Sequence, residues 1–356
     1  TPRVIVMKGH TVPRQYVKSV QQYLQFFLSN VRIGNEEIEL TYFDFIIYGM
    51  TFLMYMQNQG NQKDYSEQAP YYKIIHQRAN EYDERTTDHL LIKLWLFVQY
   101  LMTGYSKLNY RLYGFTWDWK ELENRSMFAG IFMLTSVPYQ NTYFKYYNKI
   151  RPAFKVGYGQ FIGEDPTFIK IPYNKLITES NDTTELDVYI QSHALSRMKE
   201  RLGILTPSQR NVYLNYSIKE CKICTLSNGQ LVINFLAESN FLGYLPFTIV
   251  DKKVFILTFL PKCHIKSPQG RKLAELLDIT REEMEYFGMD KLNFFHDTDF
   301  EAIPRLKNAI IEADLWHLTE IDIDLEYKPV STLSTNTLAR YFEGEKSHHD
   351  VLNELE

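Results

Sequence analysis

The sequence predicts a multidomain protein in which a mainly α-helical N-terminal domain precedes a small α+β module, followed by further helices and a polar tail. Three observations support this fold class. Apolar residues in the first half recur at the spacing of helices. After residue 186, helix-capping signals are followed by short strand-like runs. Between these parts, residues 151–185 are rich in Gly and Pro and are expected to form an irregular linker.

The N-terminal domain is assigned to residues 1–150. Its helices are expected near residues 15–30, 38–57, 86–102 and 119–135. The many Tyr and Phe side chains of these segments fall at core positions. We therefore expect them to pack in the interior rather than to stack on nucleobases.

The sequence favours a cytoplasmic protein with no membrane partner. The N-terminus TPRVIVMKGH lacks the apolar segment of a secretory signal. The most apolar windows, Phe45–Met56, Leu91–Met102 and Met127–Val137, are shorter than the roughly 18–20 residues that a membrane-spanning helix needs. They are interpreted as buried helices. Three cysteines are too few for a disulfide framework and favour a reducing compartment.

The α+β module is assigned to residues 186–262, as two helices followed by an antiparallel β-meander. The first helix is expected at residues 192–202. The second begins with the capping-box pattern T-P-S-Q at Thr206. A strand at 230–237 and a hairpin follow, the hairpin formed by residues 247–250 and 254–260 around residues 251–253.

Charge is distributed unevenly along the chain. Residues 1–185 carry 20 basic and 18 acidic side chains, the module carries 9 and 5, and residues 263–356 carry 10 and 20. We assign residues 263–330 to an acidic helical extension and residues 331–356 to the polar tail. A basic module beside an acidic end is compatible with binding of a polyanion, with the acidic end covering the basic face or competing there.

The segment SHALSRMKERLGI carries the clearest chemical pattern. On a helix, His193, Arg197 and Arg201 recur every fourth residue and form one stripe. Arginine pairs bidentately with phosphate, and histidine exchanges protons near neutral pH. Metal-independent RNA cleavage needs both functions. The alternative is a solvated helix face whose arginines pair with Glu200 or with the acidic end. Leu195, Met198 and Leu202 form a second stripe that is expected to face a sheet.

This helix, the second capped helix and the meander together resemble the RelE-like branch of the barnase–EndoU–colicin–RelE ribonuclease and toxin superfamily. The resemblance covers about residues 186–262. It implies that His193 acts as a general acid or base and that Arg197 and Arg201 bind phosphate. It also implies that Thr258, in the sequence ILTFLP on the last strand, orients the phosphate or His193.

Two further groups of residues have side chains that metal ions bind. Cys221, Cys224, Cys263 and His264 could supply zinc ligands, but two adjacent ligands are awkward, and buried cysteines are favoured. The alternating carboxylates Glu320, Asp322, Asp324 and Glu326 are interpreted as the exposed side of an edge strand rather than as a Mg²⁺ or Ca²⁺ site. His348 and His349 are expected to be solvated in the tail.

Two functions of different classes follow. The first is a metal-independent ribonuclease or RNA-binding module of a bacterial or phage toxin-like type, without a cofactor and restrained by a protein inhibitor. The alternative is a non-catalytic binding or assembly protein, such as a phage or mobile-element component, that uses the same fold as a platform.

Overall fold

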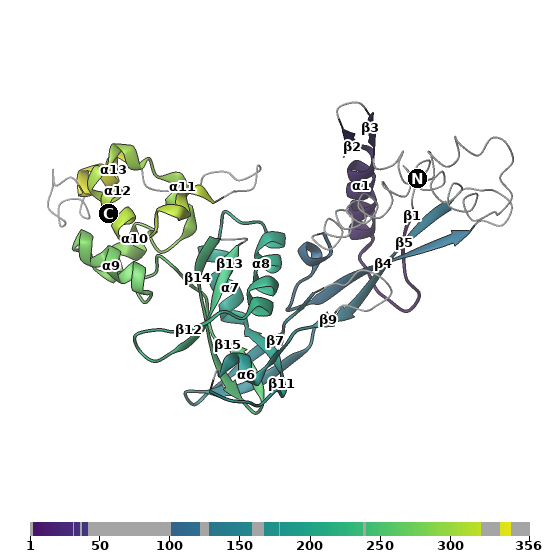
Figure 1. Ribbon diagram of the computed structural model, residues 1–356, viewed down its shortest axis with the longest axis horizontal. Coiled ribbons are helices and arrows are strands. Elements are labelled where there is room, and N and C mark those ends of the chain that lie inside the picture. The colour runs from purple at the N-terminus through teal and green to yellow at the C-terminus, as the bar shows by residue number, and fades with distance from the viewer. Residues whose placement is uncertain are drawn as a thin grey trace, which may run out of the picture. The chain divides into compact units, whose positions relative to one another are not determined.

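The computed structural model in Figure 1 describes residues 3–30, 32–35, 38–41, 101–121, 128–158, 167–177, 179–237, 240–321 and 335–342. The chain divides into two compact units. Unit 1 comprises Thr1–Pro138 and Tyr158–Thr167. Unit 2 comprises Tyr139–Gly157 and Phe168–Glu356.

Unit 1 combines a helix with a small mixed sheet. Strands β4 (Arg111–Glu121) and β5 (Phe128–Pro138) pair antiparallel along their whole length, and β1 (Arg3–Val6) lies parallel to β5. Strands β2 (Arg32–Asn35) and β3 (Ile38–Thr41) form a separate pair. Helix α1 (Arg14–Asn30) contributes to a core with the sheet that includes Val20, Leu24, Leu28, Phe115, Phe132 and Leu134.

The prediction of a mainly α-helical N-terminal domain is wrong. The helix expected at 15–30 is confirmed as α1, but the described residues of the stretch 119–135 lie in β4 and β5. This stretch is rich in aromatic and β-branched side chains, which favour strands, and a buried strand cannot be told from a buried helix by apolar spacing alone. The apolar window Met127–Val137 likewise falls largely within β5 rather than in a helix.

The two other predicted helices of this domain fall mostly outside the described residues. Of the stretch 38–57, residues 38–41 form strand β3 rather than a helix, and the residues beyond 41 are not described. Residues 86–100 of the next one are also not described, and residues 101–105 are helical.

Unit 2 is built on a mixed sheet with the strand order β12-β13-β14-β15-β11-β7-β6. Strand β11 is parallel to β15, whereas the other neighbouring strands of this order are antiparallel. The bounds are β6 Asn141–Tyr146, β7 Lys149–Lys155, β11 Glu185–Gln191, β12 Ile223–Thr225, β13 Leu231–Ala237, β14 Asn240–Val250 and β15 Lys253–Ile256.

The stretch expected to be an irregular linker contains regular elements. These are β8 (Gly157–Tyr158), β9 (Thr167–Phe168), β10 (Lys170–Pro172) and α6 (Tyr173–Leu176). β10 pairs antiparallel with the first residues of β11. The predicted boundary between residues 150 and 151 falls inside β7.

Both predicted helices of the module are confirmed, as α7 (Ser192–Arg201) and α8 (Pro207–Glu220). The capping box is present, because the Thr206 hydroxyl accepts from the Gln209 amide N–H and the Gln209 side chain accepts from the Thr206 amide N–H. Met198 and Leu202 are buried and Leu195 is half-buried, as expected for the side of α7 that packs inward.

The three predicted strands of the meander correspond to β13, β14 and β15, although β14 begins at Asn240 rather than at residue 247. The sheet also contains β12, which was not predicted, and β11, which lies parallel to β15. Asp251 and Lys252 have positive φ angles, which suit the two-residue turn between β14 and β15. The last strand is shorter than predicted, since β15 ends at Ile256 and the chain pairs with β14 again only at β16 (Leu260–Pro261). Pro246 of β14 has no N–H to donate to this part of the ladder.

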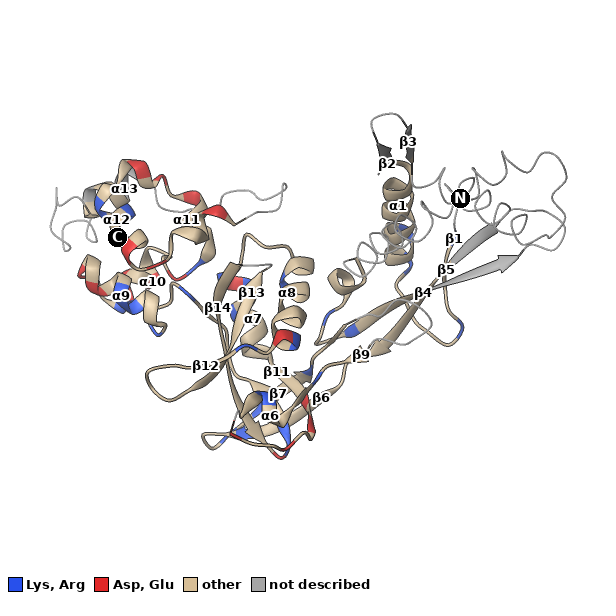
Figure 2. Cartoon of the chain, viewed as in Figure 1, with Lys and Arg blue, Asp and Glu red and all other residues tan. Residues whose placement is uncertain are grey.

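Helices follow the sheet, as expected for residues 263–330. They are α9 (Pro268–Leu277), α10 (Arg281–Tyr286), α11 (Leu292–Asp297) and α12 (Pro304–Glu312), with 3₁₀ turns at Phe300–Ala302 and Trp316–Glu320 and α13 (Thr335–Phe342) beyond. Acidic residues recur along these helices, interspersed with Lys and Arg (Figure 2). Among the helices that the structure describes, none has the length and apolar character needed to cross a membrane.

Candidate functional site

The predicted stripe lies on α7, which begins directly after the central strand β11. Gln191, the last residue of β11, has extended φ and ψ angles and is the N-cap position of the helix. Because no residue separates the strand from the helix, the first turn of α7 lies at the end of the sheet. His193 is in this first turn, Arg197 is in the middle of the helix and Arg201 is its last residue.

His193 is exposed and is surrounded by positive charge. Partial burial lowers the pKa of its imidazole, and Arg197, Arg151 and Arg201 lower that pKa further, while Glu200 raises it. Arg151 comes from β7, the sheet neighbour of β11, and its guanidinium lies 3.4 Å from the Gln191 side-chain oxygen. The neutral form of His193, which can accept a proton, is therefore favoured at neutral pH.

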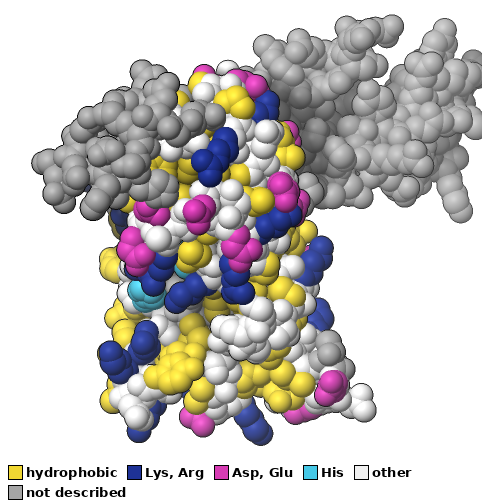
Figure 3. Space-filling view, turned by 90° about the vertical axis from the view of Figure 1, so that its left-hand side faces the viewer, with side chains coloured by type: hydrophobic (Ala, Val, Ile, Leu, Met, Phe, Trp, Pro, Cys, Tyr) yellow, Lys and Arg dark blue, Asp and Glu magenta, His cyan; other side chains and the backbone are white. Residues whose placement is uncertain are grey.

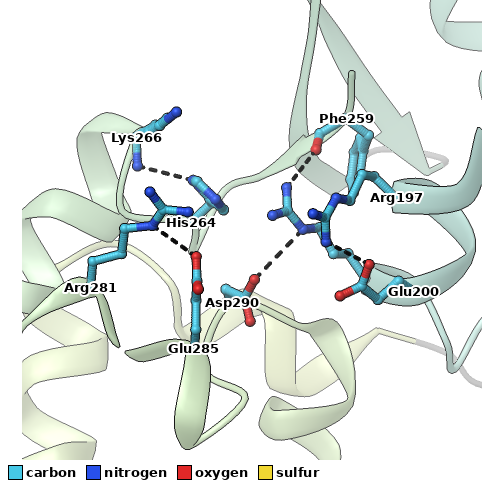
Figure 4. Close-up of polar contacts among 9 residues, drawn as sticks. Arg197, Glu200, Phe259, His264, Lys266, Arg281, Glu285 and Asp290 are labelled. Atoms are coloured by element: carbon cyan, nitrogen blue, oxygen red, sulfur yellow. Dashed lines mark hydrogen bonds and ion pairs between the residues drawn. The ribbon is translucent and has the colours of Figure 1, made fainter. Parts of the chain in front are cut away.

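Arg197 is only partly exposed and forms an ion pair within its own helix. Its Nη1 atom lies 2.7 Å from Glu200 Oε2, and both side chains remain open to solvent (Figure 4). This pair is the alternative that the sequence left open for the stripe. An exposed pair of this kind contributes at most about 1 kcal/mol, so a phosphate can compete with Glu200 for the guanidinium.

Arg201 has a different environment, because it is 6% exposed and is held by the C-terminal helical segment. Its Nη1 donates to the Phe259 carbonyl oxygen at 2.8 Å, and its Nε lies 3.6 Å from Asp290 Oδ2. Burial lowers the pKa of Arg201 and raises that of Asp290, while each charge opposes this shift in the other. Arg201 therefore stabilises the fold rather than facing solvent. As a result, the three residues His193, Arg197 and Arg201 do not line one open face.

Further charged groups surround the Arg201–Asp290 contact (Figure 4). His264 is buried, and its Nδ1 accepts from the Lys266 amide N–H at 3.0 Å. Burial, and then the nearby Arg201, Lys266 and Arg281, lower the pKa of His264 to about 3. Arg281 is paired with Glu285 at 2.8 Å. The Arg201–Asp290 contact and the 2.6 Å ion pair of Lys262 with Asp314 join the C-terminal helices to the module.

The contact of Asp290 with Arg201 agrees with the expectation that the acidic end reaches the basic stripe, although only at its buried end. Elsewhere on the face formed by the C-terminal helices, acidic and basic side chains are mixed, so that no broad patch of one sign appears in Figure 3.

Thr258 is not placed as the family resemblance implies. It is half-buried in the connection between β15 and β16, not in a strand. Within the described part of the chain, Thr258 and His193 share no hydrogen bond.

In the part of the chain that the structure describes, the three cysteines and His264 are not gathered as a set of metal ligands. Cys221, Cys224 and Cys263 are free, and Cys224 donates to the Asn234 side-chain oxygen at 3.2 Å. Burial raises the pKa of each thiol. Among the residues that the structure describes, no three His, Cys, Asp or Glu side chains gather as metal ligands.

Most of the carboxylate row and the histidine pair lie outside the described residues. Glu320 ends a 3₁₀ turn, not a strand, whereas Asp322, Asp324 and Glu326 lie outside the described residues, as do His348 and His349.

Sequence reasoning missed Arg151, because the predicted boundary separated β6 from most of β7. The available signal was the segment YFKYYNKIR, residues 143–151, in which aromatic and basic residues are interleaved without a carboxylate. The structure folds it into the hairpin β6–β7 beside β11.

Comparison of the chain with protein-family models, with curated proteins and with solved structures finds no match.

Proposed function

We propose that unit 2 is an RNA-binding module whose contact surface is the N-terminal end of α7. One observation carries this proposal: His193 is exposed in the first turn of α7, and the charges of Arg197, from the same helix, and of Arg151, from β7, both act on its imidazole. Cations that converge on one open position suit a phosphate, and phosphate contacts supply most of the affinity for nucleic acid. The resemblance to RelE-like domains favours RNA as the polyanion.

Binding is favoured over cleavage because Arg201 is withdrawn from the surface. A ribonuclease of the implied type would direct two guanidiniums and an imidazole at one phosphodiester. Here Arg201 contacts Asp290 and the Phe259 carbonyl instead. Arg151 could replace it as the second cation, and the depressed pKa of His193 provides the neutral imidazole that a general base needs. Cleavage is therefore kept as the second candidate function.

The test uses the full chain and a fluorescent single-stranded RNA oligonucleotide in EDTA. We expect the wild type to bind at low salt and Arg197→Ala and His193→Ala to weaken binding by roughly 3- to 10-fold each, as loss of one phosphate contact would. Lys199→Ala is the matched control, because Lys199 is an exposed cation on the opposite side of α7. Wild-type chain that fails to bind RNA, or equal binding by all four proteins, would overturn the proposal.

The same samples measure cleavage. If His193 is a general acid or base, wild-type protein should cut the RNA in EDTA, and His193→Ala should lower the rate by roughly 10²–10⁴-fold. Binding without cleavage would leave the binding function and reject the second candidate.

A further inference from the structure

The hairpin β6–β7 has the composition of a single-stranded nucleic-acid contact. Residues 139–155 contain six aromatic and four basic side chains and no Asp or Glu. Among the described residues, Lys145 and Lys149 are exposed and take part in no ion pair. Lys155, at the end of β7, pairs with Asp187 at 2.9 Å, so the positive charge that no described carboxylate neutralises is that of Lys145 and Lys149.

Several large apolar side chains of this hairpin are exposed rather than packed. Tyr143 is 66% exposed and Ile150 is 75% exposed. Tyr143 and Lys145 are two residues apart in β6 and so point to the same side of the hairpin. Ile150 is the cross-strand partner of Lys145 and points to that side as well. One side of the hairpin therefore presents an aromatic ring, an aliphatic side chain and an ammonium group together.

The tip of the hairpin holds a tyrosine in a backbone conformation that tyrosine disfavours. Tyr147 and Asn148 form the two-residue turn, with φ angles of 44° and 58°. Asn and Gly are preferred at such positions, and a bulky residue there costs on the order of 1 kcal/mol. Tyr147 is nevertheless 83% exposed, and its ring has one described neighbour ring, that of Tyr146, at 4.5 Å. Burial does not explain the choice of tyrosine at this position.

A hollow of about 500 Å³ lies beside Tyr147. Its other lining residues include Tyr173 of α6, Asn228 and Gln230 from the β12–β13 turn, and Phe247 of β14. The Gln230 side-chain amide is engaged, since its Nε2 donates to the Leu231 and Phe247 carbonyl oxygens. The volume is in the range of small-ligand pockets, and the mixture of rings and amides suits a flat polar heterocycle such as a nucleobase.

Arg151 connects the hairpin to the surface on α7. Its guanidinium carbon lies 6.0 Å from the centre of the Tyr146 ring, and its charge lowers the pKa of His193. The hairpin is thus adjacent to the proposed phosphate contacts.

We propose that the hairpin β6–β7 is a stacking platform for single-stranded RNA. A base stacks on Tyr147 at the edge of the hollow, a second base stacks on Tyr143, and Lys145 contacts the backbone between them. This inference rests on the proposed function and specifies its substrate as unpaired RNA, because the bases of a duplex are stacked on one another and cannot stack on protein rings.

The experiment measures the affinity of the full chain for a fluorescent single-stranded RNA and for the same RNA in a duplex. We expect the wild type to prefer the single strand. Tyr147→Asn should weaken single-strand binding by roughly 5- to 100-fold, as expected for loss of a stacked base, and should leave duplex binding unchanged. Asn suits the positive φ angle, so this substitution removes the ring without straining the fold. Tyr147→Phe keeps the ring and should bind like the wild type.

Tyr216→Ala is the matched control, because Tyr216 is an exposed tyrosine on α8. If Tyr147→Asn and Tyr143→Ala bind single-stranded RNA as the wild type does, the platform is rejected. Should Arg197→Ala weaken binding in the same series, the proposed function would still stand. If only the hairpin variants lose binding, the proposed contacts on α7 fail and the platform survives. Absence of binding by the wild type overturns both.

Discussion

Helix α7 holds two arginines of one stripe in opposite environments, Arg197 in its middle and Arg201 at its C-terminal end. Arg197 is partly exposed and pairs with Glu200 one turn away, whereas Arg201 is buried and meets Asp290, far along the chain. The two arginines are four residues apart, a spacing that puts both on the same side of the helix. What differs is the neighbour, because Asp290 of the C-terminal segment contacts Arg201, the last residue of the helix. A stripe of like residues can therefore divide into a part that supports the fold and a part that remains available to bind.

The largest expected effect follows from removing Asp290. Asp290→Ala would leave the buried Arg201 without its counter-charge, and we expect the free energy of unfolding to fall by about 3–5 kcal/mol. Glu200→Ala, which removes the partner of the exposed Arg197, is the matched comparison and should cost less than about 1 kcal/mol. Urea denaturation followed by circular dichroism measures both. Equal losses in the two variants would show that the environments of Arg197 and Arg201 do not differ as described.

A smaller effect is expected on the free energy of unfolding when the pH is lowered. An unfolded histidine titrates near pH 6.5, whereas His264 in the folded chain has a pKa of about 3. The unfolded state therefore binds the proton first. The stability contributed by neutral His264 is complete above about pH 6.5 and is lost as the pH falls from there toward 3.

His264→Asn isolates this contribution, because the amide oxygen can still accept from the Lys266 amide N–H. Between pH 7 and 4.5, the wild type should lose about 2 kcal/mol more unfolding free energy than the variant. Denaturation midpoints at the two pH values measure the difference. Parallel losses in wild type and variant would show that this histidine is not buried in its neutral form.

The sequence allowed correct prediction where local signals determine structure. The Thr206 capping box, the start and end of α7 and the turn at Asp251–Lys252 depend on residues within a few positions of each other, and all are present. The hairpin β4–β5 was missed because its identity depends on pairing across the gap between residues 121 and 128, which apolar spacing does not reveal.

The candidate site was predictable only in part, for a related reason. The order of His193, Arg197 and Arg201 on one helix follows from their spacing, but the burial of Arg201 depends on Asp290, which no local pattern connects to it. Arg151 could not be assigned to the site without knowing that β7 lies next to β11. The role of Thr258 was inferred from a strand that ends at Ile256.

The most direct test of the central claim, that the N-terminal end of α7 binds RNA phosphates, is the salt dependence of the binding constant. The logarithm of the constant for single-stranded RNA should fall linearly with the logarithm of salt concentration, by about 0.7 for each phosphate neutralised. We predict that Arg197→Gln makes this slope shallower by about that amount, whereas Lys199→Gln leaves it unchanged. A slope that is the same in wild type and Arg197→Gln would contradict the claim.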